Sequence, residues 1–156
     1  MNKDIAIIGM AGRFPEAANI YEFYKNLRNG RDSVRPVDDK RIADTALPTD
    51  VEYQTLGYLD DIDKFDHKFF NISFVEAQNM DPQQRLALEV AYETFESAGY
   101  NIDHFYNSKT AVFVSGAEYQ YQKLVDIFEP TAFSGNTHYT TAGRIARAFH
   151  LRGAAA

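Results

Sequence analysis

The sequence of 156 residues has the length of one domain or of a part of a larger one. Hydrophobic residues make up 45% of it and aromatic residues 14%, which is enough to bury a core and excludes an intrinsically disordered chain. The 22 acidic side chains outnumber the 16 Lys and Arg. The resulting formal net charge of −6 argues against nucleic acid or an anionic membrane as the main partner.

Cysteine is absent from the sequence. This excludes a disulfide framework, a thiolate metal site and a cysteine nucleophile within these residues. No apolar run approaches the length that crosses a bilayer, and the first residues lead into a short apolar segment without the pattern of a signal peptide. We therefore expect a cytoplasmic protein, with neither nucleic acid nor membrane among its partners.

The first predicted element is a strand at Ile5–Ile8, because a short apolar run that ends at a glycine is typical of a strand buried on both faces. Residues 9–15 follow as a glycine-containing turn. They lack both the Gly-x-Gly-x-x-Gly pattern and a Gly-Lys-Ser/Thr ending, so nucleotide binding is not expected here. We interpret the turn as a place where the backbone passes close to another element.

A helix is predicted from residue 20 to Gly30, because Asn19 and Glu22 form a capping pair and apolar residues then recur at helical spacing. Residues 31–58 contain Pro36, Pro48 and many aspartates, and this composition predicts a long loop.

Residues 57–66 alternate acidic and hydrophobic side chains. They do not match an EF-hand loop, which would need a glycine in place of Asp66 and a glutamate in place of Ile72. We expect an ordered loop that is anchored to the core by Leu59, Ile62 and Phe65.

The sequence is organised around residues 80–85 (MDPQQR) and the helix that they open. Asp81 is a good N-cap, Pro82 suits the first helical position, and Gln84 lies where a side chain can reach back to the cap. The helix is predicted to end at Gly99. A capping box at Ser73–Glu76 predicts a shorter helix leading into this stretch.

One narrow polar stripe on this central helix predicts that most of its circumference is buried. The stripe consists of Arg85, Glu89, Glu93 and Glu96. Phe95 lies opposite the glutamates, near two alanines that leave room for its ring, and is predicted to be a core residue. The pattern by itself is that of a core helix.

The C-terminal part begins with a predicted buried strand at Thr110–Val114 that ends at a Ser-Gly pair. A third helix is expected over residues 121–128, stopped before Pro130, and a turn over residues 134–136. A fourth helix is expected from Tyr139 through Phe149, with its end at Gly153. The pattern is α/β, but two strands are too few for a complete doubly wound sheet, so the chain is interpreted as part of a fold.

Autonomous chemistry is not evident in the sequence. The four histidines, at positions 67, 104, 138 and 150, do not have the spacing of metal ligands, and each is interpreted as a surface or hydrogen-bonded histidine. Ser115 lacks the Gly-x-Ser-x-Gly context of a nucleophile elbow. The acidic pair Asp60 and Asp61 carries no mark of a general acid.

Five segments, taken together, resemble the β-ketoacyl synthase (ketosynthase) domain of type I modular polyketide synthases. They run in order from residue 4 to residue 153 and comprise residues 4–15 (DIAIIGMAGRFP), 65–73 (FDHKFFNIS), 80–86 (MDPQQRL), 112–116 (VFVSG), and Gly135-Asn136 followed by residues 142–146 (AGRIA).

The resemblance implies a thiolase fold, a duplicated α/β core that acts as a homodimer. It also implies decarboxylative Claisen condensation of an acyl group with a malonyl-type extender, carried on the phosphopantetheine of an acyl carrier protein. That chemistry needs a cysteine and two histidines that lie, in the family, after the point where this sequence stops. No catalytic, cofactor or metal residue is therefore carried over, and residues 81–85 are interpreted as scaffold near the acyl pocket and the dimer contact.

On this basis residues 1–153 are expected to form the N-terminal segment of a ketosynthase, an incomplete thiolase-like fold truncated before the nucleophile, and residues 154–156 an alanine tail. The favoured hypothesis places the activity in the complete domain, with the remainder of the synthase and acyl carrier protein as partners. A second is a non-catalytic ketosynthase-like module for docking or dimerisation. A third, an unrelated small α/β binding protein, is disfavoured by the set of motifs.

Overall fold

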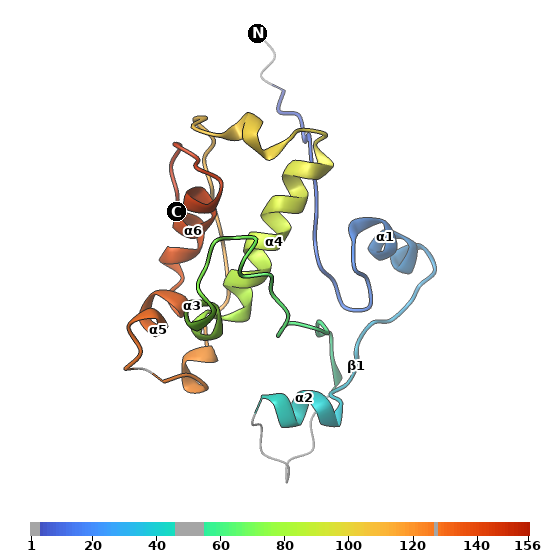
Figure 1. Ribbon diagram of the computed structural model, residues 1–156. Coiled ribbons are helices and arrows are strands. Elements are labelled where there is room, and N and C mark those ends of the chain that lie inside the picture. Colours follow the sequence, from blue (N-terminus) through green and yellow to red (C-terminus); the bar gives the residue numbers. More distant parts are fainter. Residues whose placement is uncertain (1–3, 46–54, 127) are drawn as a thin grey trace. The chain divides into compact units, whose positions relative to one another are not determined.

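The computed structural model describes residues 4–45, 55–126 and 128–156 (Figure 1). The chain divides into two compact units. One comprises Gly12–Ile62, and the other comprises Met1–Ala11 together with Asp63–Ala156. The loop predicted at residues 31–58 lies partly outside the described residues.

The smaller unit begins with helix α1 (Ile20–Arg28), and its predicted cap is confirmed. The Asn19 side chain accepts hydrogen bonds from the N–H groups of Tyr21 and Glu22, both at 3.0 Å. The Glu22 carboxylate accepts from the N–H of Ala18 at 2.9 Å. These bonds satisfy two backbone N–H groups of the first turn, which have no acceptor within the helix, and the N–H group of the residue before the cap.

The expectation of a loop over residues 31–58 is wrong for the part that the structure describes. Strand β1 (Arg35–Pro36) pairs antiparallel with β2 (Thr55–Leu56), and helix α2 (Asp39–Asp44) lies between them in the chain. Asp38 caps α2 by accepting from the N–H of Arg41 at 2.7 Å. Aspartates that were taken as loop composition therefore include a helix cap.

The Tyr58 side chain connects the elements of this part of the smaller unit. The guanidinium of Arg35 lies 4.0 Å from the ring centroid of buried Tyr58, and the Tyr58 hydroxyl donates to the Asp38 carboxylate at 3.1 Å. Arg35 also forms an ion pair with Asp60 at 2.6 Å. These contacts join β1, the α2 cap and the segment after β2 through cation–π and charge-assisted interactions.

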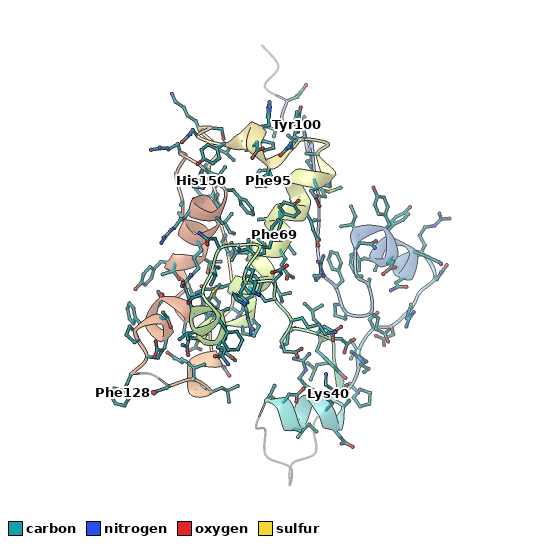
Figure 2. The ribbon with its side chains drawn as sticks, viewed as in Figure 1. Lys40, Phe69, Phe95, Tyr100, Phe128 and His150 are labelled. Carbon is teal, nitrogen blue, oxygen red and sulfur yellow. The ribbon has the colours of Figure 1, made fainter. Side chains whose placement is uncertain are left out.

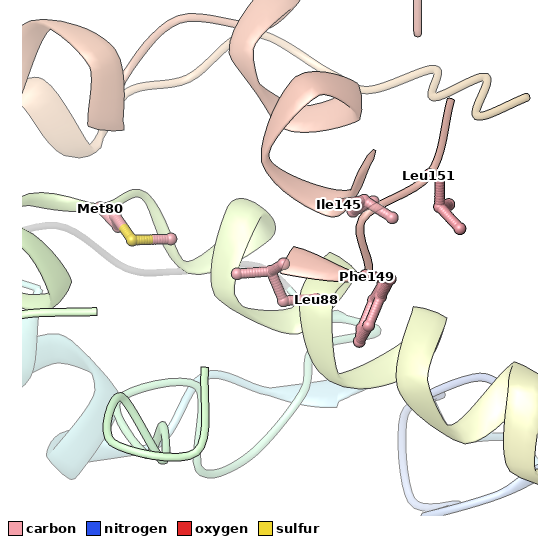
Figure 3. Close-up of a cluster of buried hydrophobic side chains, with 5 residues drawn as sticks. All are labelled: Met80, Leu88, Ile145, Phe149 and Leu151. Atoms are coloured by element: carbon pink, nitrogen blue, oxygen red, sulfur yellow. The ribbon is translucent and has the colours of Figure 1, made fainter. Parts of the chain in front are cut away.

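The larger unit contains the main core, formed by helices α4 (Pro82–Ser97) and α6 (Tyr139–Ala148), which pack on each other. Helix α3 (Phe74–Asn79) packs on α5 (Pro130–Gly135), and two short 3-10 helices, η1 (Ile102–Phe105) and η2 (Tyr121–Lys123), complete the elements described there. Figure 3 shows the buried apolar cluster: Met80, Leu88, Ile145, Phe149 and Leu151.

The predicted bounds of α3 and α4 are confirmed. Ser73 caps α3 by accepting from the N–H of Glu76 at 3.1 Å, and Asp81 caps α4. Gly99 follows the last turn of α4 with φ of +77°, the left-handed conformation in which glycine is favoured. Helix α6 begins at Tyr139 as expected, but its predicted end at Gly153 is wrong, because the helix ends at Ala148 and Arg152 and Gly153 pair with Ser108 and Thr110 instead.

The prediction of a strand at Ile5–Ile8 is wrong. The segment is not a strand, and the side chains of Ile5 and Ile7 are 94% and 78% exposed. A strand requires a neighbour for its backbone groups, and no described residue pairs with this segment. The turn that follows does approach α4 closely, because the Met10 N–H donates to Ser97 Oγ at 2.9 Å and a Cβ at Gly9 would collide with the carbonyl of Thr94.

A buried strand was predicted at Thr110–Val114. The structure confirms an extended backbone there that pairs with a parallel segment. Val112 bridges to Ala155, and the N–H groups of Val112 and Val114 donate to the carbonyls of Ala154 and Ala156 at 2.7 and 2.9 Å. Burial on both faces is wrong, because Phe113 is 75% exposed while the valines are half-buried. The last alanines thus extend a parallel ladder.

The third predicted helix is also wrong. Residues 121–123 form only η2, and the Asp126 carboxylate accepts from the N–H of Phe128 at 3.0 Å. This local hydrogen bond competes with the helical pattern. Pro130 begins α5 as its first residue instead of following a helix, so the expected turn at residues 134–136 is the end of α5.

We predict that Phe95→Ala lowers the free energy of unfolding by about 2–4 kcal/mol, somewhat below the range for a fully buried phenylalanine because Phe95 is half-buried. Its ring centroid lies 4.5 Å from that of Phe105 and 5.4 Å from that of Phe149, so truncation leaves a cavity at the core (Figure 2). Urea denaturation measures the change. Exposed Phe113→Ala is the control, with an expected loss under about 1 kcal/mol; equal losses would contradict the assigned core.

Candidate functional site

Among the described residues, buried polar side chains gather at the start of α4. Met80 is 0% exposed and Asp81 is 4% exposed, although Asp81 is an acidic N-cap. Its Oδ1 accepts from the N–H of Gln83 at 2.8 Å, as the sequence predicted, and Pro82 occupies the first helical position. The stretch that is most specific in sequence is therefore also a buried turn.

Gln84 does not reach back to the cap, so that prediction is wrong. Its side chain is 1% exposed and spans to the turn that precedes α6. The Nε2 group donates to the carbonyls of Ser134 and Thr137 at 3.2 and 3.3 Å, and to Thr140 Oγ1 at 3.1 Å. Gln84 thus links α4 to residues 50 to 56 positions away.

The backbones of the α3–α4 junction and of α5 approach each other directly. The Asp81 N–H donates to the Gly135 carbonyl at 2.9 Å, and the Asn136 side-chain amide donates to the Asn79 carbonyl at 2.8 Å. A Cβ at Gly135 would collide with that same Asn79 carbonyl. A glycine is required here because of this close approach.

Arg85 was expected on an exposed polar stripe, and that expectation is wrong. The residue is 8% exposed. Its Nη1 donates to the Asp63 carbonyl at 3.4 Å, and its guanidinium lies 5.6 Å from the ring centroid of Tyr121. Sequence periodicity placed Arg85 with the glutamates, whereas in the structure it contacts Asp63 and the η2 segment.

Burial controls the electrostatics of this turn. Burial raises the pKa of Asp81, and the hydrogen bonds from the Gln83 and Tyr121 backbones and the charges of Arg85 and His138 only partly oppose that shift. Burial also raises the pKa of Tyr119, whose hydroxyl lies 2.6 Å from Thr141 Oγ1. Both groups act as structural hydrogen-bonding partners in this arrangement.

The histidines do not converge. His67 Nδ1 lies 2.7 Å from the Ile72 carbonyl, and the other three each contact a tyrosine ring: Tyr100, Tyr119 and Tyr106 for His104, His138 and His150. Within the described ranges no group of three or more potential metal-ligating side chains is found. Asp60 pairs with Arg35.

Two grooves border α6, and sequence reasoning missed both. One has a volume of about 590 Å³ and is lined by apolar Phe70, Ile72 and Leu88 and by Gly143 and Arg147 of α6. The other, of about 220 Å³, is lined mainly by aromatic residues and shares Phe70 with the first. No helix in the described part of the chain has the length and apolar character needed to cross a membrane.

A family profile described as "Beta-ketoacyl synthase, N-terminal domain" matches residues 2–156. The chain belongs to the β-ketoacyl synthase family. This confirms the resemblance drawn from the sequence motifs, which run from residue 4 to residue 153.

Curated relatives include polyketide synthases. The chain is 38% identical over 155 residues to polyketide synthase PksM of Bacillus subtilis, covering 97% of this chain and 4% of that protein. It is 34% identical over 167 residues to cyclo-acetoacetyl-L-tryptophan synthase of Aspergillus oryzae, covering 98% of this chain and 4% of that protein. The chain therefore spans a small fraction of the length of these relatives.

Solved ketosynthases have the same fold. The ketosynthase from module 6 of the bacillaene synthase of Bacillus subtilis superimposes with a TM-score of 0.81 at 35% identity, covering 96% of this chain and 24% of that chain. An oxazolomycin ketosynthase domain of Streptomyces albus gives a TM-score of 0.78 at 32% identity, covering 96% of this chain and 28% of that one. The thiolase-like fold class predicted from the sequence is confirmed.

We predict that Gly135→Ala destabilises the β-ketoacyl synthase chain by about 2–4 kcal/mol, because the new methyl group would displace the Asn79 carbonyl and the two hydrogen bonds beside it. Chemical denaturation monitored by circular dichroism measures the loss. The matched control is Gly143→Ala on α6, where nothing lies within 4 Å of the added Cβ. That variant is expected to be neutral or stabilised by up to about 1 kcal/mol; a comparable loss in both would refute the close approach.

We also predict a pH-dependent gain for Asp81→Asn, which keeps a good N-cap but cannot ionise. Because the pKa of Asp81 is raised on folding, its ionisation is disfavoured in the folded state, and this cost is absent below the unfolded-state pKa, about pH 4. The unfolding free energy of the variant minus that of the native chain should therefore rise with pH above about pH 4 and level off above the folded-state pKa. A difference that falls with rising pH would contradict the assigned shift.

Proposed function

We propose that this chain is the N-terminal part of a polyketide synthase ketosynthase, and that its role is to form the scaffold on which the condensing site of the complete domain is built. The observation that carries the proposal is the agreement in fold, over 96% of this chain, with a solved ketosynthase of which it spans 24%. The complete domain would catalyse decarboxylative Claisen condensation of an acyl thioester with a malonyl-type extender.

The chemistry would be supplied outside these residues. The sequence contains no cysteine to hold an acyl chain as a thioester. None of its histidines lies beside a nucleophile in the described structure, and His67 and His138 are engaged by a carbonyl and by a tyrosine ring. The acyl carrier protein, with its phosphopantetheine, and a second copy of the domain are the partners proposed for the complete enzyme.

Exposed apolar side chains support a scaffold role. Ile5, Ile7 and Phe113 project from extended segments with 94%, 78% and 75% of their surfaces exposed. Phe128 and Phe133 of the α5 region are 88% and 70% exposed, and Phe128 points away from the neighbouring helices (Figure 2). Such surface is characteristic of a face that packs against another part of an assembly.

The parallel pairing at the C-terminal residues also supports this role. Arg152 and Gly153 donate backbone hydrogen bonds to Ser108 and Thr110 at 2.8 and 3.0 Å, and the ladder continues to Val114. Helix α6 thus returns the chain parallel to the earlier extended segment, forming a β–α–β connection. A strand in this register would deliver whatever follows it to the end of the sheet, where α/β proteins place their sites.

We predict that the chain by itself forms no acyl-enzyme, because it has no thiol nucleophile. Incubation with an acetyl N-acetylcysteamine thioester, followed by intact-protein mass spectrometry, should show no mass increase that hydroxylamine removes. The control is a complete cysteine-containing ketosynthase treated in parallel. A stable, hydroxylamine-sensitive acetyl adduct on this chain would overturn the proposed division of labour.

The alternative is a non-catalytic docking or dimerisation module. A second experiment distinguishes this module from the ketosynthase scaffold. Residues 2–156 replace the matching segment in the ketosynthase of PksM, and acylation, condensation and dimerisation of the chimera are measured. Acylation and condensation by a folded chimera would support the ketosynthase scaffold. A folded chimera that dimerises but is never acylated would support the docking module instead.

A further inference from the structure

The outward face of α6 carries an unusual combination of residues. Tyr139, Gly143 and Arg147 occupy equivalent positions on successive turns, and all three are exposed. The opposite face buries Thr141, Ala142 and Ile145 in the unit's core. Beside the outward face lies the groove of about 590 Å³ described above. Its lining combines apolar side chains, such as Phe70 and Ile72, with polar ones, such as Asn71 and Thr140, which suits a peptide segment that carries both kinds of group.

Gly143 has no evident role in the fold of this chain. Apart from its chain neighbours and the backbone of its own helix, no described atom lies within 4 Å of the position that its Cβ would occupy, whereas Cβ atoms at Gly135 and Gly153 would contact the backbone of other segments. An interior helical glycine costs about 1 kcal/mol relative to alanine. A glycine on a helix face allows the backbone of another segment to approach closely. We therefore interpret Gly143 as a point of close approach for a segment outside this chain.

The two arginines that line the groove differ in their ionic partners. Arg144 is neutralised by an ion pair with Glu76 at 2.5 Å and by a hydrogen bond to Ser134 Oγ at 3.1 Å. Arg147, one turn beyond Gly143, makes no ion pair or side-chain hydrogen bond with any part of the chain that the structure describes. An exposed guanidinium in the lining of a groove complements a carboxylate, which it can bind through two parallel hydrogen bonds.

We propose that this groove binds an extended peptide segment of a partner polypeptide, whose backbone crosses Gly143. One apolar side chain would contact Phe70 and Ile72, and a carboxylate two residues further along would bind Arg147. Alternate side chains of an extended chain lie on the same face, about 6.6 Å apart, so both can face the groove while the intervening one faces away. The site is separate from the proposed condensing chemistry and does not depend on it.

The test uses three fluorescein-labelled peptides added to the full chain and measured by fluorescence anisotropy. The first has the sequence Gly-Gly-Leu-Gly-Glu-Gly-amide, and the other two replace the leucine with serine or the glutamate with lysine. We expect the leucine–glutamate peptide to bind at least tenfold more tightly than either comparison peptide. The chain has a net charge of −6, so non-specific attraction would favour the lysine peptide instead.

Two variants locate the site. Gly143→Leu should weaken binding of the leucine–glutamate peptide at least tenfold by occupying the crossing point, and Arg147→Glu should weaken it similarly while improving binding of the lysine peptide. Arg28→Glu, which changes an exposed arginine on α1 and alters net charge equally, should leave binding within twofold. Circular dichroism checks that each variant folds, and Arg147→Met provides a second test at that position.

Equal affinity for all three peptides, or unchanged binding by folded Gly143→Leu and Arg147→Glu, would overturn the proposal. Loss of binding in Arg28→Glu to the same extent would also overturn it, because the effect would then come from net charge.

Discussion

The larger unit depends on one buried polar junction, where the residues that open α4 hold the turn that precedes α6. The amide of Gln84 donates to the Ser134 and Thr137 carbonyls, and the Asp81 N–H donates to Gly135. The Ser134 and Thr137 carbonyls also accept from Thr140 Oγ1, at 2.8 and 2.6 Å. The groups that would lose their partners without the junction are therefore the buried Gln84 amide and the Asp81 N–H, at a cost of about 1–3 kcal/mol each. Packing of Leu88 against Ile145 then follows, because the junction sets where α6 begins.

This constraint gives a physical meaning to the most specific motif of the chain. In this chain, α6 is the element that returns the backbone to the parallel ladder with Val112 and Val114. Fixing the start of α6 therefore fixes the direction and register of the residues that follow it. The motif at residues 81–85 acts through position and hydrogen bonding, and its only ionisable cap, Asp81, is buried at some electrostatic cost.

Local features of the fold could be predicted from the sequence, and tertiary ones could not. The caps at Asn19, Ser73 and Asp81 were predictable because a cap is satisfied within three or four residues of itself. The strand expected at Ile5–Ile8 was not found, because pairing requires neighbours that local sequence does not specify.

The candidate site shows the same division. The motif could be located, but the partner of Gln84 lies more than fifty residues away, and a reach back to the local cap looked equally suitable. The burial of Arg85 likewise depends on Tyr121 and Asp63, which no helical periodicity could indicate. The grooves along α6 were also beyond prediction, since Phe70 and Gly143 meet only after folding.

The most direct test is native-state hydrogen exchange, resolved residue by residue by NMR across a denaturant series. If the junction governs the unit, the Asp81 amide and the central amides of α4 and α6 should exchange through one common opening with the same free energy. Gln84→Ala should lower that free energy for both helices together. Exchange of α6 at a distinctly lower free energy than α4, unaffected by Gln84→Ala, would contradict the account.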